Sequence, residues 1–149
     1  MADETANPIF VAADLLSQAE HGVDSQAILI TTSVELQQAV KVEVERQLAL
    51  LPRKEIAEKS LANSKLIVVD SMAEAIELTN AYAPEHLIIE TEDYLSVAER
   101  IVNAGSVFLG SLTPESAGDY ASGTKPYPCR QTAMLKHTAV SASTALSAR

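Results

Sequence analysis

Three groups of polar residues in this 149-residue chain could carry chemistry. Gln18 and His21 stand three residues apart in LLSQAEHG, Glu85 and His86 are neighbours after a proline, and Asp119 lies in PESAGDYASG. Imidazole nitrogen, carboxylate oxygen and, less often, amide oxygen bind Zn²⁺. A carboxylate beside an imidazole can activate water and relay a proton. Metal binding and proton transfer are therefore the chemistries to consider.

The first group belongs to a helix with two different stripes. Asp14, Gln18 and His21 follow one another at intervals of four and three residues, so their side chains share one stripe, apart from the apolar one. Gln18, His21 and Asp119 together could supply three zinc ligands. The alternative is structural: His21 is favoured at a helix C-terminus by the helix dipole, and Gln18 is merely solvated.

The other two groups are equally open to a structural interpretation. Within a strand Glu85 and His86 would face opposite ways, but at a turn led by proline both can point into one cleft. The alternative is a polar turn entering a strand. Gly118 and Gly123 flank Asp119, which suits close approach of a ligand or an ordinary surface loop. The sequence contains no glycine-rich dinucleotide fingerprint, no Walker loop and no nucleophile elbow.

The elements that must position these residues alternate between helix and strand. A helix capped by Asn7 should run to a stop at Gly22. The remaining patterns predict strands at 27–32, 64–70, 86–91 and 106–110, and helices at 34–51, 53–63, 71–84 and 92–105. This order predicts an α/β fold, a parallel sheet with helices on both faces, which is an incomplete Rossmann-like domain. In such sheets ligands usually bind at the carboxyl ends of the strands.

Composition narrows the classes of partner. With 47% hydrophobic and 21% charged residues, the chain has the composition of one globular domain. A net charge of -9 argues against nucleic acid as a partner and favours a metabolite or protein. Cys129 is the only cysteine, no apolar run reaches membrane-spanning length, and the acidic start MADETANP is unlike a signal peptide. We expect a cytoplasmic protein that does not contact membranes.

The amino-acid composition and the apolar pattern of the sequence change near Thr124. All twenty acidic residues lie before that position, and the last stretch has no clear apolar period. We therefore divide the chain into a domain at 1–124 and a tail at 125–149, which we expect to be disordered or of foreign origin.

The segments that hold the polar groups resemble the signature segments of histidinol dehydrogenases, zinc- and NAD-dependent enzymes of histidine biosynthesis. The resemblance covers residues 2–124 and runs, in order, through ADETANP, AADLLSQAEHG, APEHLII, NAGSVFLG and TPESAGDYASGT. It implies that Gln18, His21 and Asp119 bind zinc and contact the substrate histidinol together with His86. It further implies that Glu85 is the base that activates water and that His86 relays the proton.

The resemblance also implies that parts of the family's site lie elsewhere. Family members are much longer, and the matching region lacks the upstream half of the catalytic domain and the NAD-binding domain. In the family the fourth zinc ligand, a histidine, and a substrate-binding glutamate come from the neighbouring subunit of a homodimer. His137 in the tail is not expected to replace that ligand, because a reading frame shifted by two bases from Lys125 can encode a family-like continuation.

Two hypotheses of different classes follow. The first is a histidinol dehydrogenase chain that oxidises histidinol to histidine with zinc and NAD in the whole enzyme, and that is inactive alone. The second is a non-catalytic α/β module for interaction or residual metal binding, whose uncovered apolar surface would favour association.

Overall fold

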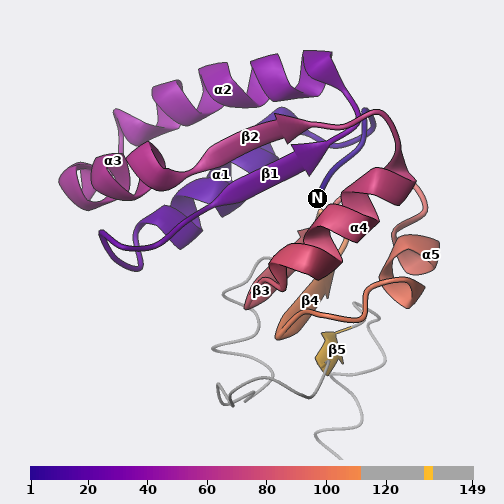
Figure 1. Cartoon of the computed structure of the whole chain (residues 1–149). Coiled ribbons are helices and arrows are strands. Elements are labelled where there is room, and N and C mark those ends of the chain that lie inside the picture. Colours follow the sequence, from indigo (N-terminus) through magenta and orange to yellow (C-terminus); the bar gives the residue numbers. More distant parts are fainter. Residues whose placement is uncertain (112–132, 136–149) are drawn as a thin grey trace, which may run out of the picture.

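The computed structural model describes residues 1–111 and 133–135, in which helices alternate with short strands (Figure 1). The elements are α1 (Pro8–Ala19), β1 (Ile28–Thr31), α2 (Val34–Leu48), α3 (Lys54–Asn63), β2 (Lys65–Val68), α4 (Met72–Tyr82), β3 (His86–Ile89), α5 (Tyr94–Glu99), β4 (Ser106–Leu109) and β5 (Ala133–Leu135). Among these helices none is long and apolar enough to cross a membrane.

Helix starts follow the capping residues that the sequence offers. The side chain of Asn7 accepts a hydrogen bond from the backbone N–H of Ile9, with proline at the first helical position of α1. Ser33 and Ser71 cap α2 and α4 in the same way. Each cap satisfies a backbone donor that the helix itself leaves unpaired, so these boundaries match the predictions.

All the strand pairings are parallel. Strand β1 pairs with β2, β3 pairs with β4, and β5 joins the far edge of β4. The first residues of the chain lie between the two groups, because Ala2 forms bridges to both Thr31 and Glu90. The order across the molecule is therefore β2, β1, residues 1–3, β3, β4, β5, which confirms the predicted parallel α/β sheet.

Helices cover both faces of this sheet, and alternate side chains of each strand enter two separate cores. On one face Ile30, Leu87 and Val107 pack with residues of α4 and α5. On the other, Leu29 and Ala2 pack with residues of α1 and α2. The two cores explain why a change of one residue in strand register would turn every side chain to the wrong face.

The segment 125–149 was predicted to be a disordered or foreign tail, and most of it lies outside the described residues. Within it the structure describes β5, whose Ala133 lies opposite Ser106 of β4. The boundary at Thr124 stays a prediction.

Candidate functional site

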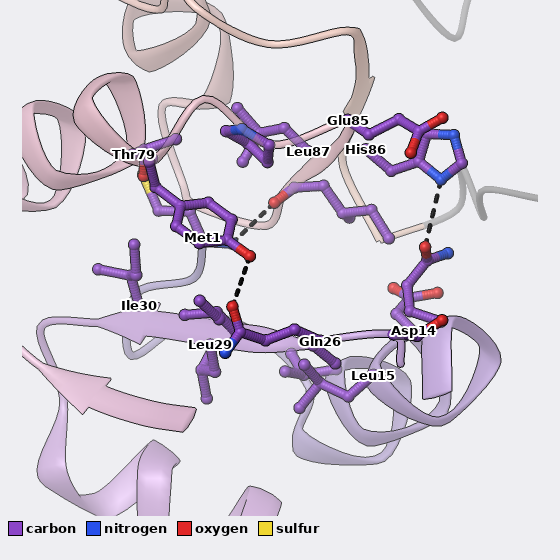
Figure 2. Close-up of a pocket in the computed structure, with 18 of the residues that line it drawn as sticks. Met1, Asp14, Leu15, Gln26, Leu29, Ile30, Thr79, Glu85, His86 and Leu87 are labelled. Atoms are coloured by element: carbon purple, nitrogen blue, oxygen red, sulfur yellow. Dashed lines mark hydrogen bonds between the residues drawn. The ribbon is translucent and has the colours of Figure 1, made fainter. Parts of the chain in front are cut away.

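Gln18 and His86 meet across 68 residues of sequence. The Oε1 of Gln18, in the last turn of α1, lies 3.2 Å from the Nδ1 of His86, the first residue of β3 (Figure 2). Since an amide oxygen only accepts, this contact is a hydrogen bond in the forms of the ring that carry a proton on Nδ1. The contact therefore fixes which edge of the His86 ring faces Gln18, with Nε2 on the edge away from it.

His86 is also packed by two other rings. Its centroid lies 6.5 Å from that of His21 and 6.1 Å from that of Phe108, both in edge-to-face arrangements. Phe108 is almost fully buried on β4. Gln18, His21 and His86 are thus gathered around one point, and Phe108, which the sequence analysis did not single out, packs against it.

His21 reaches this point from a position beyond the helix. The prediction of one rigid helix up to Gly22 is wrong, because α1 ends at Ala19 and Glu20 is its C-cap. The backbone N–H of His21 donates to the carbonyl of Gln18 at 3.3 Å, which continues the helical path for part of a turn. This tightened end keeps His21 near Gln18.

Strand alternation explains why His86 faces α1. Leu87 and Ile89 enter the core beneath α4 and α5, so His86, Ile88 and Glu90 must point to the opposite face, where α1 lies. His86 begins its strand, so the cluster sits at the amino edge of the parallel sheet. The expectation of a site at the carboxyl ends is therefore wrong for these residues.

Glu85 is exposed and lies just before β3, where it lines the same cavity as His86. Its backbone is fixed by Gly105 and Ser106, since Ser106 N–H donates to the Glu85 carbonyl at 2.8 Å and Gly105 N–H donates to that of Pro84 at 2.9 Å. A Cβ on Gly105 would lie 2.6 Å from the Glu85 carbonyl oxygen. Glycine at position 105 is thus what allows this close approach.

The predicted third ligand, Asp119, lies outside the described residues. Within the described residues, no three His, Cys, Asp or Glu side chains gather closely enough to hold a metal ion. Gln18 and His21 nevertheless present an amide and an imidazole to one place, and Gln18 Nε2 is buried there without a hydrogen-bond partner among the described residues. This donor set fits zinc if a carboxylate joins it.

The cavity beside the cluster has a volume of about 560 Å³, and a second polar pair, Asp14 and Glu90, lines it. Glu90 is 6% exposed. Burial, followed by the hydrogen bond and charge of Asp14, raises the pKa of Glu90 to about 7. This carboxyl therefore holds a proton through much of the acidic range.

The amino group of Met1 lies in the same cavity and donates a hydrogen bond to the carbonyl of Ile88 at 2.8 Å. Burial lowers its pKa to about 6, against the opposing charges of Glu90 and Asp14. Buried Met1 and Ala2 were missed in the sequence, where the first ordered element was placed at Asn7. Glu90 was missed too, although the spacing of two from His86 through Ile88 could have revealed it.

Comparison with known proteins finds one family by sequence and by structure. The family profile described as histidinol dehydrogenase matches residues 1–138. The histidinol dehydrogenases of Bacteroides thetaiotaomicron and Bacteroides fragilis are 79% and 77% identical over 124 residues, which is 83% of this chain and 29% of each relative. The crystal structure of histidinol dehydrogenase from Elizabethkingia anophelis superposes with a TM-score of 0.80 at 58% identity, over 83% of this chain and 28% of that one. The chain thus spans less than a third of the length of these relatives.

Proposed function

The chain belongs to the histidinol dehydrogenase family, and we propose that it contributes the metal-binding and proton-transfer residues for oxidation of histidinol to histidine. The observation that carries the proposal is the meeting of Gln18, His21 and His86 at one point, since family resemblance assigns a role to each.

In this proposal Gln18, His21 and Asp119 would hold a zinc ion, and the chemistry that such an ion would supply is to orient the substrate and polarise its oxygen. The Nδ1 contact with Gln18 fixes the His86 ring, so that Nε2 accepts a proton from the substrate. Glu85, exposed at the cavity, takes a proton from the water that attacks the intermediate aldehyde.

The rest of the reaction depends on groups beyond those described. NAD would take the hydride, and the family's nucleotide-binding domain would bring it to the site. A second subunit would supply a histidine and a glutamate in a cytoplasmic homodimer. We therefore propose that this chain alone does not oxidise histidinol, and that residual metal binding is the activity it keeps.

A chimera tests this function. Residues 1–124 would replace the matching segment of the Bacteroides thetaiotaomicron relative, and NADH formation with histidinol would be measured. We expect turnover within about tenfold of the parent, and a fall of about 10²–10⁴-fold in kcat for Glu85→Gln in the chimera. Gln26→Ala, at the opposite side of the cavity, is the control. A chimera that folds without turnover, or an unaffected Glu85→Gln, would contradict the proposal.

A further inference from the structure

The side chain of Asn80, in the last turn of α4, is hydrogen-bonded to the chain that leads from α5 to β4 (Figure 1). Its Oδ1 accepts from the backbone N–H groups of Val102, at 2.8 Å, and Asn103, at 3.2 Å. Its Nδ2 donates to the carbonyl of Arg100 at 3.0 Å. In return, the side chain of Asn103 donates to the Asn80 carbonyl at 3.1 Å. The two asparagines therefore hold the loop between α5 and β4 against the end of α4.

Both carbonyls in this arrangement lie at helix C-termini, where the helix leaves them without a partner. Arg100 is the C-cap of α5. The residue four positions after Asn80 is Pro84, which has no N–H to offer to the Asn80 carbonyl. A carboxamide side chain can donate to a carbonyl and accept from two N–H groups at the same time. Aspartate could only accept and leucine could do neither, so the chemistry of this position calls for an amide.

The loop that Asn80 holds leads directly to the backbone of Glu85. Only one residue separates Asn103 from Gly105. Gly105 N–H donates to the Pro84 carbonyl at 2.9 Å, and the N–H of Ser106 donates to the Glu85 carbonyl at 2.8 Å. A Cβ on Gly105 would lie 2.6 Å from that Glu85 oxygen, so the two backbones are in close contact. A displacement of the loop is therefore passed on to Glu85.

Asn80 is also connected to Glu85 along the chain. Glu85 follows α4 after Ala83 and Pro84, and the N–H of Ala83 donates to the Thr79 carbonyl at 2.9 Å. The end of α4, the turn that follows it and the start of β4 thus form a closed ring of covalent bonds and hydrogen bonds. Without the Asn80 side chain this ring is open, and the backbone of Glu85 is held more weakly from the side of β4.

We propose that Asn80 is a positioning residue for Glu85: it holds the loop between α5 and β4, and this loop fixes the backbone that carries the Glu85 carboxyl. The inference rests on the proposed function, in which that carboxyl takes a proton from the water that attacks the intermediate aldehyde. A general base must lie within hydrogen-bond reach of the proton it takes. A shift of the Glu85 backbone therefore slows the oxidation of the aldehyde, which uses water, and leaves the oxidation of the alcohol unchanged.

Amide hydrogen exchange in the full chain tests whether Asn80 holds this backbone. In Asn80→Ala the amides of Gly105 and Ser106 should exchange faster by about tenfold or more, because their local opening becomes easier. The amide of Val69, which is bonded to β1 in the other half of the sheet, should keep its rate. Glu77→Ala, at an exposed position of α4, is the matched control and should change none of these rates. Unchanged rates at Gly105 and Ser106 in Asn80→Ala would overturn the proposal.

The chimera used to test the proposed function shows whether the position of Glu85 matters for catalysis. Asn80→Ala should lower kcat by about 10²-fold with little change in KM for histidinol, since a small misplacement of a catalytic group costs about that much. In a single turnover the first NADH should form at the parental rate and the second should be slowed. In the Glu85→Gln background Asn80→Ala should cause no further loss, whereas a general structural defect would add to it.

A conservative variant separates the hydrogen bonds from the bulk of the side chain. Asn80→Asp keeps the two bonds accepted by Oδ1, so it should restore most of the exchange protection and activity that Asn80→Ala loses. Equal impairment by aspartate and alanine, or additive losses in the double variant, would overturn the positioning role. Full activity of Asn80→Ala beside an impaired Glu85→Gln would do the same. An unaffected Glu85→Gln would instead overturn the proposed function, and the exchange rates, which do not depend on catalysis, tell the two failures apart.

Discussion

The imidazole Nδ1 of His86 lies 3.2 Å from the amide Oε1 of Gln18, and this contact joins the start of β3 to the end of α1. It fixes the orientation of the one ring that touches both His21 and Phe108. It also sets the side of the ring from which a proton can be accepted.

Replacing Gln18 by leucine should release this ring. We expect the ¹⁵N shifts of His86 to move from those of the Nδ1–H form toward a mixture, because the acceptor for that proton is lost. Gln26→Leu, which removes instead the 2.7 Å hydrogen bond with Tyr82, is the matched control and should leave His86 unchanged. Identical His86 spectra in the chain and in Gln18→Leu would show that the contact does not orient the ring.

Glu90 should make stability depend on pH in an unusual direction. Its pKa is raised to about 7 by burial and by Asp14, so between roughly pH 4.5 and 7 the folded chain binds more protons than the unfolded chain. The free energy of unfolding should therefore fall, by roughly 2 kcal/mol, as pH rises through this window.

The Glu90→Gln variant should lack this dependence of the free energy of unfolding on pH. Urea unfolding of both proteins between pH 4.5 and 6 measures the difference below the range in which the Met1 amine contributes. Between pH 6 and 8 the buried Met1 amine, with a pKa of about 6, has the opposite effect: because the unfolded chain then binds more protons at this group, it raises the free energy of unfolding as pH rises. A fall of the same size in the Glu90→Gln variant would exclude Glu90 as its origin.

Gly105→Ala should disturb the backbone of Glu85. The added Cβ would lie 2.6 Å from the Glu85 carbonyl oxygen, a backbone atom that cannot rotate away. We expect a loss of about 1–3 kcal/mol in the free energy of unfolding. At Gly22 the nearest atom to such a Cβ is 3.7 Å away, so Gly22→Ala should be close to neutral. Similar losses in both variants would argue against a specific close approach.

Ala83→Gly should stabilise the chain. Ala83 caps α4 in the left-handed region, with φ 56° and ψ 63°, where its Cβ is strained. Glycine relieves this strain, and we expect a gain of about 1 kcal/mol in thermal or urea unfolding. Ala81→Gly, inside the same helix, should instead cost up to about 1 kcal/mol. A destabilising Ala83→Gly would show that the strain is absent.

Local signals predicted most of the fold. The caps Asn7, Ser33 and Ser71 and the short β-branched runs act within a few residues, so their elements could be placed from sequence. The place of residues 1–3 could not be predicted, because it depends on the bridges of Ala2 to Thr31 and Glu90, which lie far along the chain. The same distinction holds for the site. The spacing of three residues predicts that Gln18 and His21 lie together, whereas His86 reaches them only because alternate residues of β3 face α1 in the folded sheet.

Isothermal titration calorimetry of Zn²⁺ into the unmodified chain measures whether Gln18 and His21 bind the metal. We expect one site that His21→Ala and Gln18→Ala each weaken at least tenfold, and that His137→Ala leaves unchanged. Zinc affinity that is lost in His137→Ala, or that is indifferent to both His21 and Gln18, would contradict this expectation.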